Sequence, residues 1–277
     1  MELSDIRETK VGVLDKAVTI LLAFTRGDQA LSPQEIAERT DLPLPTVYRL
    51  AQALSEHGLL MKEGPRFRLG MTLLRLGMLV AEGVDVRQQA MRHLKWLNEQ
   101  TGENAELQIR QEETRLVIEV VSSPHNLRPF ADVGMLLPLH RGAAGKVLLA
   151  WLPVEQREDL AQASAARYGD SIDFDVTRFL SELEHVRLTG WAKSEGERFP
   201  DVSAIAAPIF SADGQIVGAM TLVAPSSRLN AEQFERYTPL VCEAARRTSH
   251  DLFQNPQTFQ NLRTDRKRSS SLRRPEG

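Results

Sequence analysis

Apolar residues recur at helical spacing in the N-terminal part of the chain. In residues 13–24, "VLDKAVTILLAF", they fall at positions i, i+3, i+4 and i+7, which is the pattern of an amphipathic helix. Gly27 and Asp28 follow this stretch and are expected to end the helix. The residues expected on its inward face are Leu14, Ala17, Val18 and Leu21.

Two further helices are predicted after this turn. Ser32 is a good N-cap, Pro33 suits the first helical position and Glu35 stands three residues after the cap, so "SPQE" is typical of a capping box. Pro43 and Pro45 disfavour helix before them, and Pro45 can begin the next helix. The stripe expected to be buried in that helix consists of Val47, Leu50, Ala51 and Leu54.

A hairpin is predicted next, because two short apolar runs in "LLMKEGPRFRL" are joined around Glu63-Gly64-Pro65. Three helices followed by a hairpin form a winged helix-turn-helix. Many small domains have this geometry without touching DNA, so packed helices with no DNA contact are the alternative. The exposed face of the third helix favours DNA, since arginine can reach guanine acceptors in the major groove and hairpin arginines can hold phosphate. The residues concerned are Thr46, Tyr48, Arg49, Arg66 and Arg68.

The segment after the hairpin is unusually apolar. Residues 71–81, "MTLLRLGMLVA", are apolar on most sides, and at a domain junction we expect another subunit to cover them. Residues 84–101 predict another amphipathic helix, ended by Gly102. Its inward residues are expected to be Ala90, Leu94 and Leu97.

From residue 103 onward the pattern changes to strands. "NAELQIR" alternates, "RLVIEVV" is β-branched, and "SAIAAPIF" and "QIVGAMTLVA" flank a turn at Asp213-Gly214 that predicts a hairpin. Helices are expected between these strands at about 143–152, 153–163 and 175–189, and Asn230 is expected to cap a final long helix. This order predicts an α+β domain with an antiparallel or mixed sheet flanked by helices.

Composition narrows the class of protein. The chain has 277 residues, which favours two domains, and no apolar run approaches the ~18 residues that span a bilayer. Its first residues are too polar for a signal peptide, so we expect a cytoplasmic protein with no membrane partner. The net charge of -3 shows no global basic footprint, so DNA contact must rely on a local face. Residues 255–277 are basic without apolar periodicity and predict a disordered tail, either a solvated terminus or a source of sequence-independent affinity for nucleic acid.

Signatures of catalysis and of metal binding are missing from the sequence. Its histidines and its single cysteine show no HExxH or CxxC spacing, and there is no G-x-S-x-G. The segment "HRGAAGK" is not a phosphate loop, because His140 stands where the first glycine belongs and Val147 where serine or threonine belongs. We therefore expect no metal, no cofactor and no enzymatic activity, and a structural role for His140.

Several segments together resemble the IclR family of bacterial transcriptional regulators along about residues 11–254. In the first domain these are "LDKAVTILLAF", "LSPQEIAERTDLPLPTVYRLAQALSEHGLL" and "FRLG". In the second they are "SPHNLRPFADVGMLLPLHRGAAGKVLLAWLP", "GWAKSEGE", "SAIAAPIF" and "APSSRL", of which the "PLH…GK.LLA" element is the most specific. The resemblance implies a winged helix-turn-helix at 11–72, a linker helix at 73–83, an effector-binding domain at 84–254 and the tail at 255–277.

The resemblance also implies partners and sites. Family members are homodimers or homotetramers that bind operator DNA through the winged helix and a small organic molecule through the second domain. By position, the DNA-reading residues are Pro45, Thr46, Tyr48 and Arg49, with Arg66 in the wing. The effector-binding positions are Asn126, Pro129, Phe130, Leu137, Ala143, Ala144, Ser194, Val202, Ala204, Thr221 and Val223. This chain departs from many relatives at Ala204, where they have cysteine, and at Ala224-Pro225, where they have Gly-Pro.

The expected function is that of a one-component transcriptional regulator. A helix that begins near Ala143 can hold a carboxylate at its N-terminus, which leads to the hypothesis of an acidic effector; tight helix–sheet packing is the alternative explanation of the small residues there. The alternative functions are a DNA-binding factor without effector and an enzyme that uses the winged helix for assembly. Effector identity and the choice between repression and activation stay open.

Overall fold

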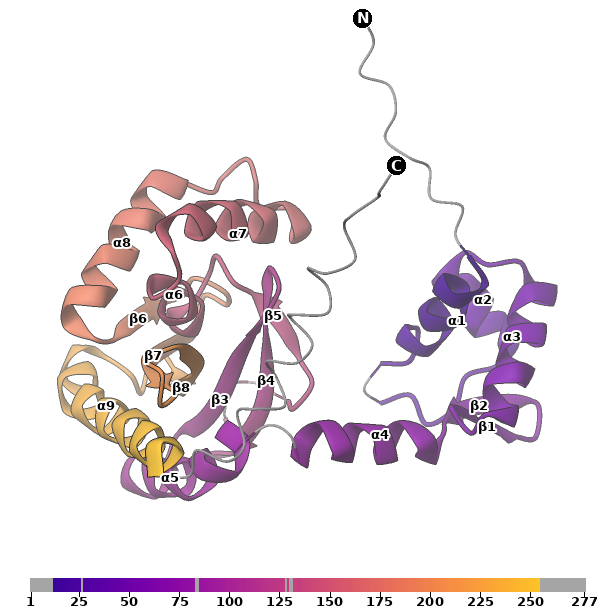
Figure 1. The fold of residues 1–277 in the computed structure, drawn as a ribbon, viewed down its shortest axis with the longest axis horizontal. Helices are drawn as coiled ribbons and strands as arrows, with labels where there is room; N and C mark the ends of the chain where they lie inside the picture. The colour runs from indigo at the N-terminus through magenta and orange to yellow at the C-terminus, as the bar shows by residue number, and fades with distance from the viewer. Residues whose placement is uncertain (1–11, 26, 83–84, 128, 130–131, 255–277) are drawn as a thin grey trace, which may run out of the picture. The chain divides into compact units, whose positions relative to one another are not determined.

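The computed structural model describes residues 12–254, apart from 26, 83–84, 128 and 130–131. The chain divides into two compact units, Met1–Glu82 and Gly83–Gly277, and each is described by itself (Figure 1). The predicted basic tail at 255–277 lies outside the described residues.

The first unit contains the predicted winged helix-turn-helix. Helices and a hairpin follow one another along the chain in the expected order, and the two strands pair antiparallel. Leu31 adds a backbone bridge to Phe67, which ties the hairpin to the start of the second helix. The elements are α1 (Val13–Leu22), α2 (Pro33–Thr40), α3 (Leu44–Glu56), β1 (Leu60–Glu63), β2 (Arg66–Leu69) and α4 (Met71–Glu82).

Local sequence signals explain α2 and α3. The Ser32 hydroxyl accepts a hydrogen bond from the Glu35 amide at 3.2 Å, and the Glu35 carboxylate accepts one from the Ser32 amide at 2.7 Å, so the capping box is confirmed. Asp41, with φ of 54°, ends α2 in the left-handed region. The stripe predicted to be buried in α3 is buried: Val47, Leu50, Ala51 and Leu54.

The predicted inward face of α1 is wrong in part. Leu14 and Val18 are 76% and 44% exposed, whereas Ile20 is completely buried. Ala17 and Leu21 do pack partly against the core, as expected. Because α1 is apolar on most sides, its sequence contains two overlapping stripes, and the period of 3.6 residues does not decide which of them faces α3.

The second unit is the predicted α+β domain. Among the described residues its sheet has the strand order β5-β4-β3-β8-β7-β6, and each neighbouring pair is antiparallel, which settles the choice between antiparallel and mixed. The edge strands β5 and β6 were not predicted because three and four residues are too few for an alternation to be recognised. The elements are α5 (Asp85–Thr101), β3 (Asn104–Gln111), β4 (Thr114–Val121), β5 (Leu136–Pro138), α6 (Ala143–Ala150), α7 (Val154–Arg167), α8 (Val176–Thr189), β6 (Ala192–Glu195), β7 (Val202–Phe210), β8 (Ile216–Pro225) and α9 (Ala231–Gln254).

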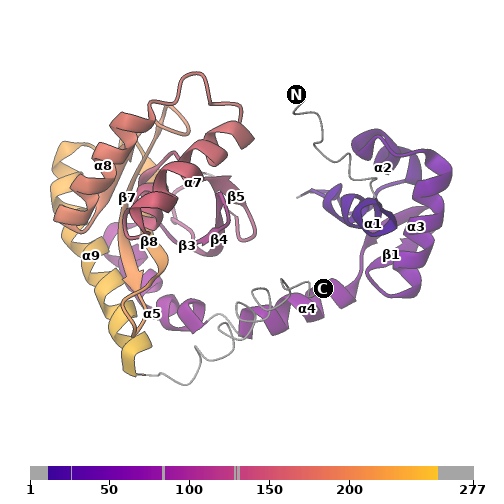
Figure 2. The ribbon, with the colours of Figure 1, turned by 45° about the horizontal axis from the view of Figure 1, so that its top comes forward.

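Helices cover both faces of this sheet. The helices α5 and α9 lie side by side on one face, while α6, α7 and α8 lie on the other (Figures 1 and 2). Since side chains alternate along a strand, each central strand contributes to both layers. In β7, for example, Ile205 and Ala207 pack toward α5 and α9, whereas Ala204 and Ala206 pack toward α6 and α8.

Candidate functional site

The exposed face of α3 carries the predicted DNA-reading residues. Pro45 and Arg49 are exposed, Tyr48 is 49% exposed and Thr46 is half-buried. The buried stripe on the opposite side of the helix holds this face outward. Within the part of the chain that the structure describes, Arg49 has neither an ion pair nor a side-chain hydrogen bond, so its guanidinium is available to a partner.

The two hairpin arginines differ in how they are held. Arg66 donates to the carbonyl of Ala30 at 3.1 and 2.9 Å, and to the Glu35 carboxylate at 2.7 Å. It therefore fastens the wing to the capping box of α2, a role that sequence reasoning missed. Arg68 lies 4.0 Å from Glu63 and donates to the Met61 sulfur at 3.7 Å, contacts that leave it freer to meet phosphate.

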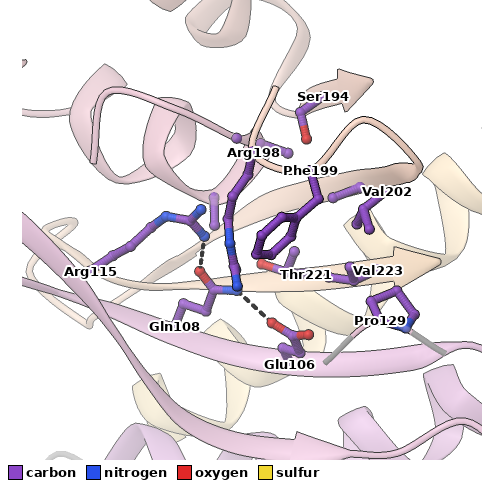
Figure 3. Close-up of a pocket in the computed structure, with 14 residues that line it drawn as sticks. Glu106, Gln108, Arg115, Pro129, Ser194, Arg198, Phe199, Val202, Thr221 and Val223 are labelled. Carbon is purple, nitrogen blue, oxygen red and sulfur yellow. Dashed lines mark hydrogen bonds between the residues drawn. The ribbon is translucent and has the colours of Figure 1, made fainter. Parts of the chain in front are cut away.

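A pocket lies in the second unit between the sheet and the start of α6 (Figure 3). Strand alternation builds it: in β3, Ala105 and Leu107 point toward α5 and α9, so Glu106 and Gln108 point to the opposite face. In the register of β3 with β8, Glu106 pairs with Thr221. The cavity itself has a volume of about 40 Å³.

The structure brings most of the predicted effector residues together around this pocket. Those that line it are Pro129, Ala143, Ala144, Ser194, Val202, Ala204, Thr221 and Val223. Leu137 is buried in β5 but does not line the pocket, since it packs on the strand edge beside Arg115. Asn126 is an exposed loop residue away from the lining, and Phe130 lies outside the described residues.

The pocket also has a polar lining that the sequence analysis missed. It consists of Glu106, Gln108, Arg115 and Arg198, and the lining also includes two residues without a polar side chain that were missed as well, Gly142 and Phe199. A signal was present in "NAELQIR", where two polar residues alternate with apolar ones. In a sheet with one solvated face such residues point to water, and only the presence of helices on both faces makes them buried.

Hydrogen bonds link three of these side chains in a row. Arg115 donates to the Gln108 side-chain oxygen, and Gln108 donates to Glu106 Oε2 at 2.7 Å (Figure 3). Arg115 also donates to the carbonyl oxygens of Pro138 at 2.8 Å and Arg141 at 3.2 Å. These bonds fix the buried guanidinium in place.

Burial shifts the ionisation of this polar lining. Burial raises the pKa of Glu106, an effect that the bond from Gln108 and the charges of Arg115 and Arg198 only partly offset. Burial lowers the pKa of Arg115 to about 10, which still leaves it charged at neutral pH. Arg198 likewise has a lowered pKa, mainly because of burial.

The start of α6 differs from the expected anion site. The Gly142 amide donates to Glu197 Oε2 at 2.8 Å, and the other oxygen of Glu197 accepts from Lys146 at 2.5 Å. A carboxylate of the chain itself therefore occupies the amide at the N-cap of this helix. A Cβ at Gly145 would lie 2.2 Å from the carbonyl oxygen of Leu139, so the close approach of the segment between β5 and α6 explains that glycine.

His140 lies between a serine and an aspartate, an arrangement that invites comparison with a catalytic triad. Its Nδ1 is 3.0 Å from Ser164 Oγ and its Nε2 is 2.8 Å from Asp170 Oδ2. Ser164 is completely buried, however, and its oxygen accepts the Leu139 amide at 2.8 Å. A substrate has no access to this hydroxyl, so the cluster is structural, as expected for His140.

Among the described residues, no three His, Cys, Asp or Glu side chains are grouped in a way that would hold a metal ion. No described helix combines the length and the apolar character needed to cross a membrane.

Comparison with known proteins identifies the class. Residues 13–64 match the IclR helix-turn-helix domain, and residues 78–250 match the C-terminal domain of the bacterial transcriptional regulator IclR. The chain is 28% identical over 221 residues to the regulator KdgR of Escherichia coli, covering 78% of this chain and 83% of KdgR. It is 29% identical over 244 residues to the regulator BhcR of Paracoccus denitrificans, covering 86% of each.

Solved structures agree with this comparison. A putative IclR transcriptional regulator from a Silicibacter species superposes with a TM-score of 0.71 at 28% identity, covering 87% of this chain and 96% of the other. An IclR homologue from Microbacterium hydrocarbonoxydans, crystallised with 4-hydroxybenzoate, superposes with a TM-score of 0.75 at 24% identity, covering 87% of this chain and 99% of the other. At that identity the second likeness concerns the fold.

The winged helix and the domain matches define a DNA-binding transcriptional regulator, and its relatives are regulators rather than enzymes. The chain belongs to the IclR family of bacterial transcriptional regulators.

Proposed function

We propose that this protein is a one-component regulator whose operator binding is modulated by a small organic acid held in the pocket of the second unit. The observation that carries the proposal is the charge balance of that pocket. Arg115 and Arg198 both line it, and neither forms an ion pair with a carboxylate among the described residues. Arg115 is buried and Arg198 is half-buried, and guanidinium groups without a carboxylate partner in such a place favour an anionic ligand.

The nearby carboxyl groups do not cancel this positive charge. Glu197 is held by Lys146 and by the Gly142 amide. Burial raises the pKa of Glu106, so its negative charge is less favoured than that of an exposed carboxylate. The hypothesis of an acidic effector therefore rests on two arginines, and not on the N-terminus of α6 as the sequence suggested. The 4-hydroxybenzoate bound by the Microbacterium relative is an acid of this kind.

The size of the cavity implies movement on binding. A volume of about 40 Å³ is close to that of one or two water molecules. Phe199 lines the cavity and is half exposed, so its ring can turn toward solvent without disturbing the core. We expect an effector to displace this ring.

DNA binding is assigned to the exposed face of α3 and to the wing. Arg49 is placed to read a base edge, Pro45, Thr46 and Tyr48 to contact backbone or thymine, and Arg68 to contact phosphate. Arg66, which Ala30 and Glu35 hold on one side, would add a phosphate contact from its exposed side. These roles rest on exposure and on the winged-helix geometry. The cytoplasm, where operator DNA lies, is the corresponding location.

A homo-oligomer is the proposed assembly. Apolar side chains on α1 and α4 are exposed in the single chain, and so many exposed apolar side chains favour a protein interface. A second copy is the partner that would also supply a second winged helix for a two-fold operator. The exposed residues are Val13, Leu14, Val18, Leu22, Met71, Leu74 and Leu76.

The test combines DNA and effector. Fluorescence anisotropy at fixed salt compares DNA from upstream of the gene with scrambled DNA, and organic acids are then added to the complex. We expect preference for the upstream DNA and a change of affinity with at least one acid. Arg198→Gln should weaken the acid response about tenfold, since a charge-assisted hydrogen bond is lost. The control Arg246→Gln, on an exposed position of α9, should leave it unchanged.

The outcomes separate the candidate functions. If the protein binds the upstream DNA specifically but no acid changes that binding, the function is that of a DNA-binding factor without effector. Equal binding to both DNAs would contradict regulation at this upstream site.

A further inference from the structure

Two buried oxygen atoms in the pocket have no hydrogen-bond partner among the described residues. They are Oε1 of Glu106 and Oγ1 of Thr221. The two residues pair in the register of β3 with β8, and they are 2% and 1% exposed. Both line the same cavity, where Figure 3 shows them on the same side of the sheet. A buried polar atom without a partner is costly, so the pair indicates a group that belongs between them.

The orientation of Glu106 is imposed by its neighbours. Because arginine only donates hydrogen bonds, the Gln108 oxygen must face Arg115 and the Gln108 amide nitrogen must face Glu106. Glu106 Oε2 is therefore an acceptor, and any proton on this carboxyl group sits on Oε1. Oε1 is thus the atom presented to the cavity, and the chain from Arg115 to Glu106 acts as a positioning device.

We propose that the effector is a hydroxy acid whose hydroxyl group is bound between Glu106 and Thr221 while Arg198 and Arg115 bind its carboxylate. This inference rests on the function proposed above, and it names the chemical class of the ligand. Glu106 and Thr221 then determine specificity, and Gln108 and Arg115 position Glu106.

A hydroxyl group fits this pair better than the other small groups do. It both donates and accepts, so it satisfies a threonine hydroxyl together with a carboxyl group in either protonation state. An ammonium group would be repelled by the two guanidinium groups that line the same pocket. A methyl group would leave the oxygen atoms of Glu106 and Thr221 without a partner. Polar sites discriminate most strongly against ligands that leave their polar groups unpaired.

The test uses matched ligands on the full-length protein. Isothermal titration calorimetry compares acids that differ in one group: acetate with glycolate, propionate with 3-hydroxypropionate and β-alanine, and benzoate with 3- and 4-hydroxybenzoate. We expect at least one hydroxy acid to bind about tenfold or more tightly than its partner without the hydroxyl. β-Alanine should bind no better than propionate.

Variants then test whether Glu106 and Thr221 cause the preference for the hydroxyl group. Thr221→Val keeps the shape of the side chain and should reduce the preference to within about threefold, mainly by weakening the hydroxy acid. Glu106→Met, a second variant of similar length, should do the same. Thr248→Val, at a buried threonine of α9 that donates to the Ala244 carbonyl, is the matched control and should keep the preference. A melting curve with each variant confirms that the protein is folded.

Different results overturn different statements. If acids bind but no pair shows a preference for the hydroxyl, or if Thr221→Val and Glu106→Met both keep the preference, the hydroxy-acid inference is wrong and the acidic effector stands. If β-alanine binds more tightly than 3-hydroxypropionate, the pair recognises an ammonium group and the inference is also wrong. If no acid in the set binds and none alters DNA binding, the proposed acidic effector fails together with the inference.

Discussion

Strand β3 and helix α3 each pack with one face and carry the proposed recognition residues on the other, but that other face is buried in β3 and exposed in α3. In α3, the buried stripe that includes Leu50 holds Arg49 out toward solvent. In β3, Leu107 packs against α5 and α9 while the buried side chain of Glu106 lines the pocket. A DNA duplex needs an exposed surface, whereas a small ligand is recognised best where water is excluded.

The difference also appears in the electrostatics of the two faces. Burial raises the pKa of Glu106 and lowers that of Arg115 in the pocket, whereas the face of α3 that carries Arg49 is exposed to solvent. Exposed positive charges attract an extended polyanion such as DNA over a long range. A small ligand must instead replace the hydration that Glu106 and Arg115 have lost.

The largest expected effect tests the packing face of β3. Leu107→Ala should lower the free energy of unfolding by about 4 kcal/mol, because it removes a completely buried side chain and leaves a cavity. Urea unfolding measures this change, and Leu188→Ala, at a residue that is exposed on α8, is the control with little effect. Unfolding of Leu107→Ala at the same urea concentration as the wild type would contradict the packing assignment.

The next effect tests a face assigned to another copy of the chain. Leu76→Arg should weaken association of the chain by about 3 kcal/mol, roughly a hundredfold, since an unpaired charge enters an apolar interface. The response to effector should be lost with it, because both depend on the same assembly. Analytical ultracentrifugation measures the oligomer. Leu188→Arg introduces the same charge on α8 and should leave the oligomer intact. An unaltered oligomer in Leu76→Arg would refute the assignment of α4 to the interface between copies.

A smaller effect tests the exposed face of α3. Arg49→Ala should cost about 2 kcal/mol of operator affinity, roughly thirtyfold, and relax specificity at one base pair. Stability should be unchanged because the side chain is exposed. Footprint titrations on single-base operator variants measure this. Arg68→Ala is the comparison and should weaken all sequences alike, and the same uniform loss with Arg49→Ala would mean that Arg49 contacts only phosphate.

The smallest effect concerns the buried face of β3 and is measured as the pH dependence of stability. The pKa of Glu106 is raised in the folded protein above the ordinary value of 4.5, so the folded state holds its proton more tightly than the unfolded state does. This group's contribution to stability is therefore greatest at low pH and declines as the pH rises from 4.5 through the raised pKa. Glu106→Gln does not titrate, and its stability relative to the wild type should rise over that window. Urea unfolding at several pH values, without ligand, measures the difference; a constant difference would mean that Glu106 titrates normally.

Much of the fold was predictable from local patterns. The capping box of α2, the buried stripe of α3, the hairpin of the wing and the strands β3, β4, β7 and β8 all follow from signals that span a few residues. The inward face of α1 was predicted only in part, because its sequence is apolar on most sides. The strands β5 and β6 are too short to show a period and exist because the sheet supplies neighbours for them.

The pocket was predictable only along its small and apolar side. Positions such as Ala143 and Thr221 were predicted through the family resemblance, and they line one cavity. Arg115 gave no such signal, since it lies at the start of a β-branched strand and resembles a surface residue in the sequence. It becomes a buried charge only because α6 and strand β5 pack over it.

The sequence by itself determined the type and order of most elements, the two-part organisation and the family, because helical and strand periods, caps and turns act over short stretches of chain. The tertiary structure alone decided which faces are buried. Only when helices cover both sides of the sheet do Glu106, Gln108 and Arg115 leave water and meet one another. Desolvation depends on every segment packed around a group, so no local pattern along the chain contains it.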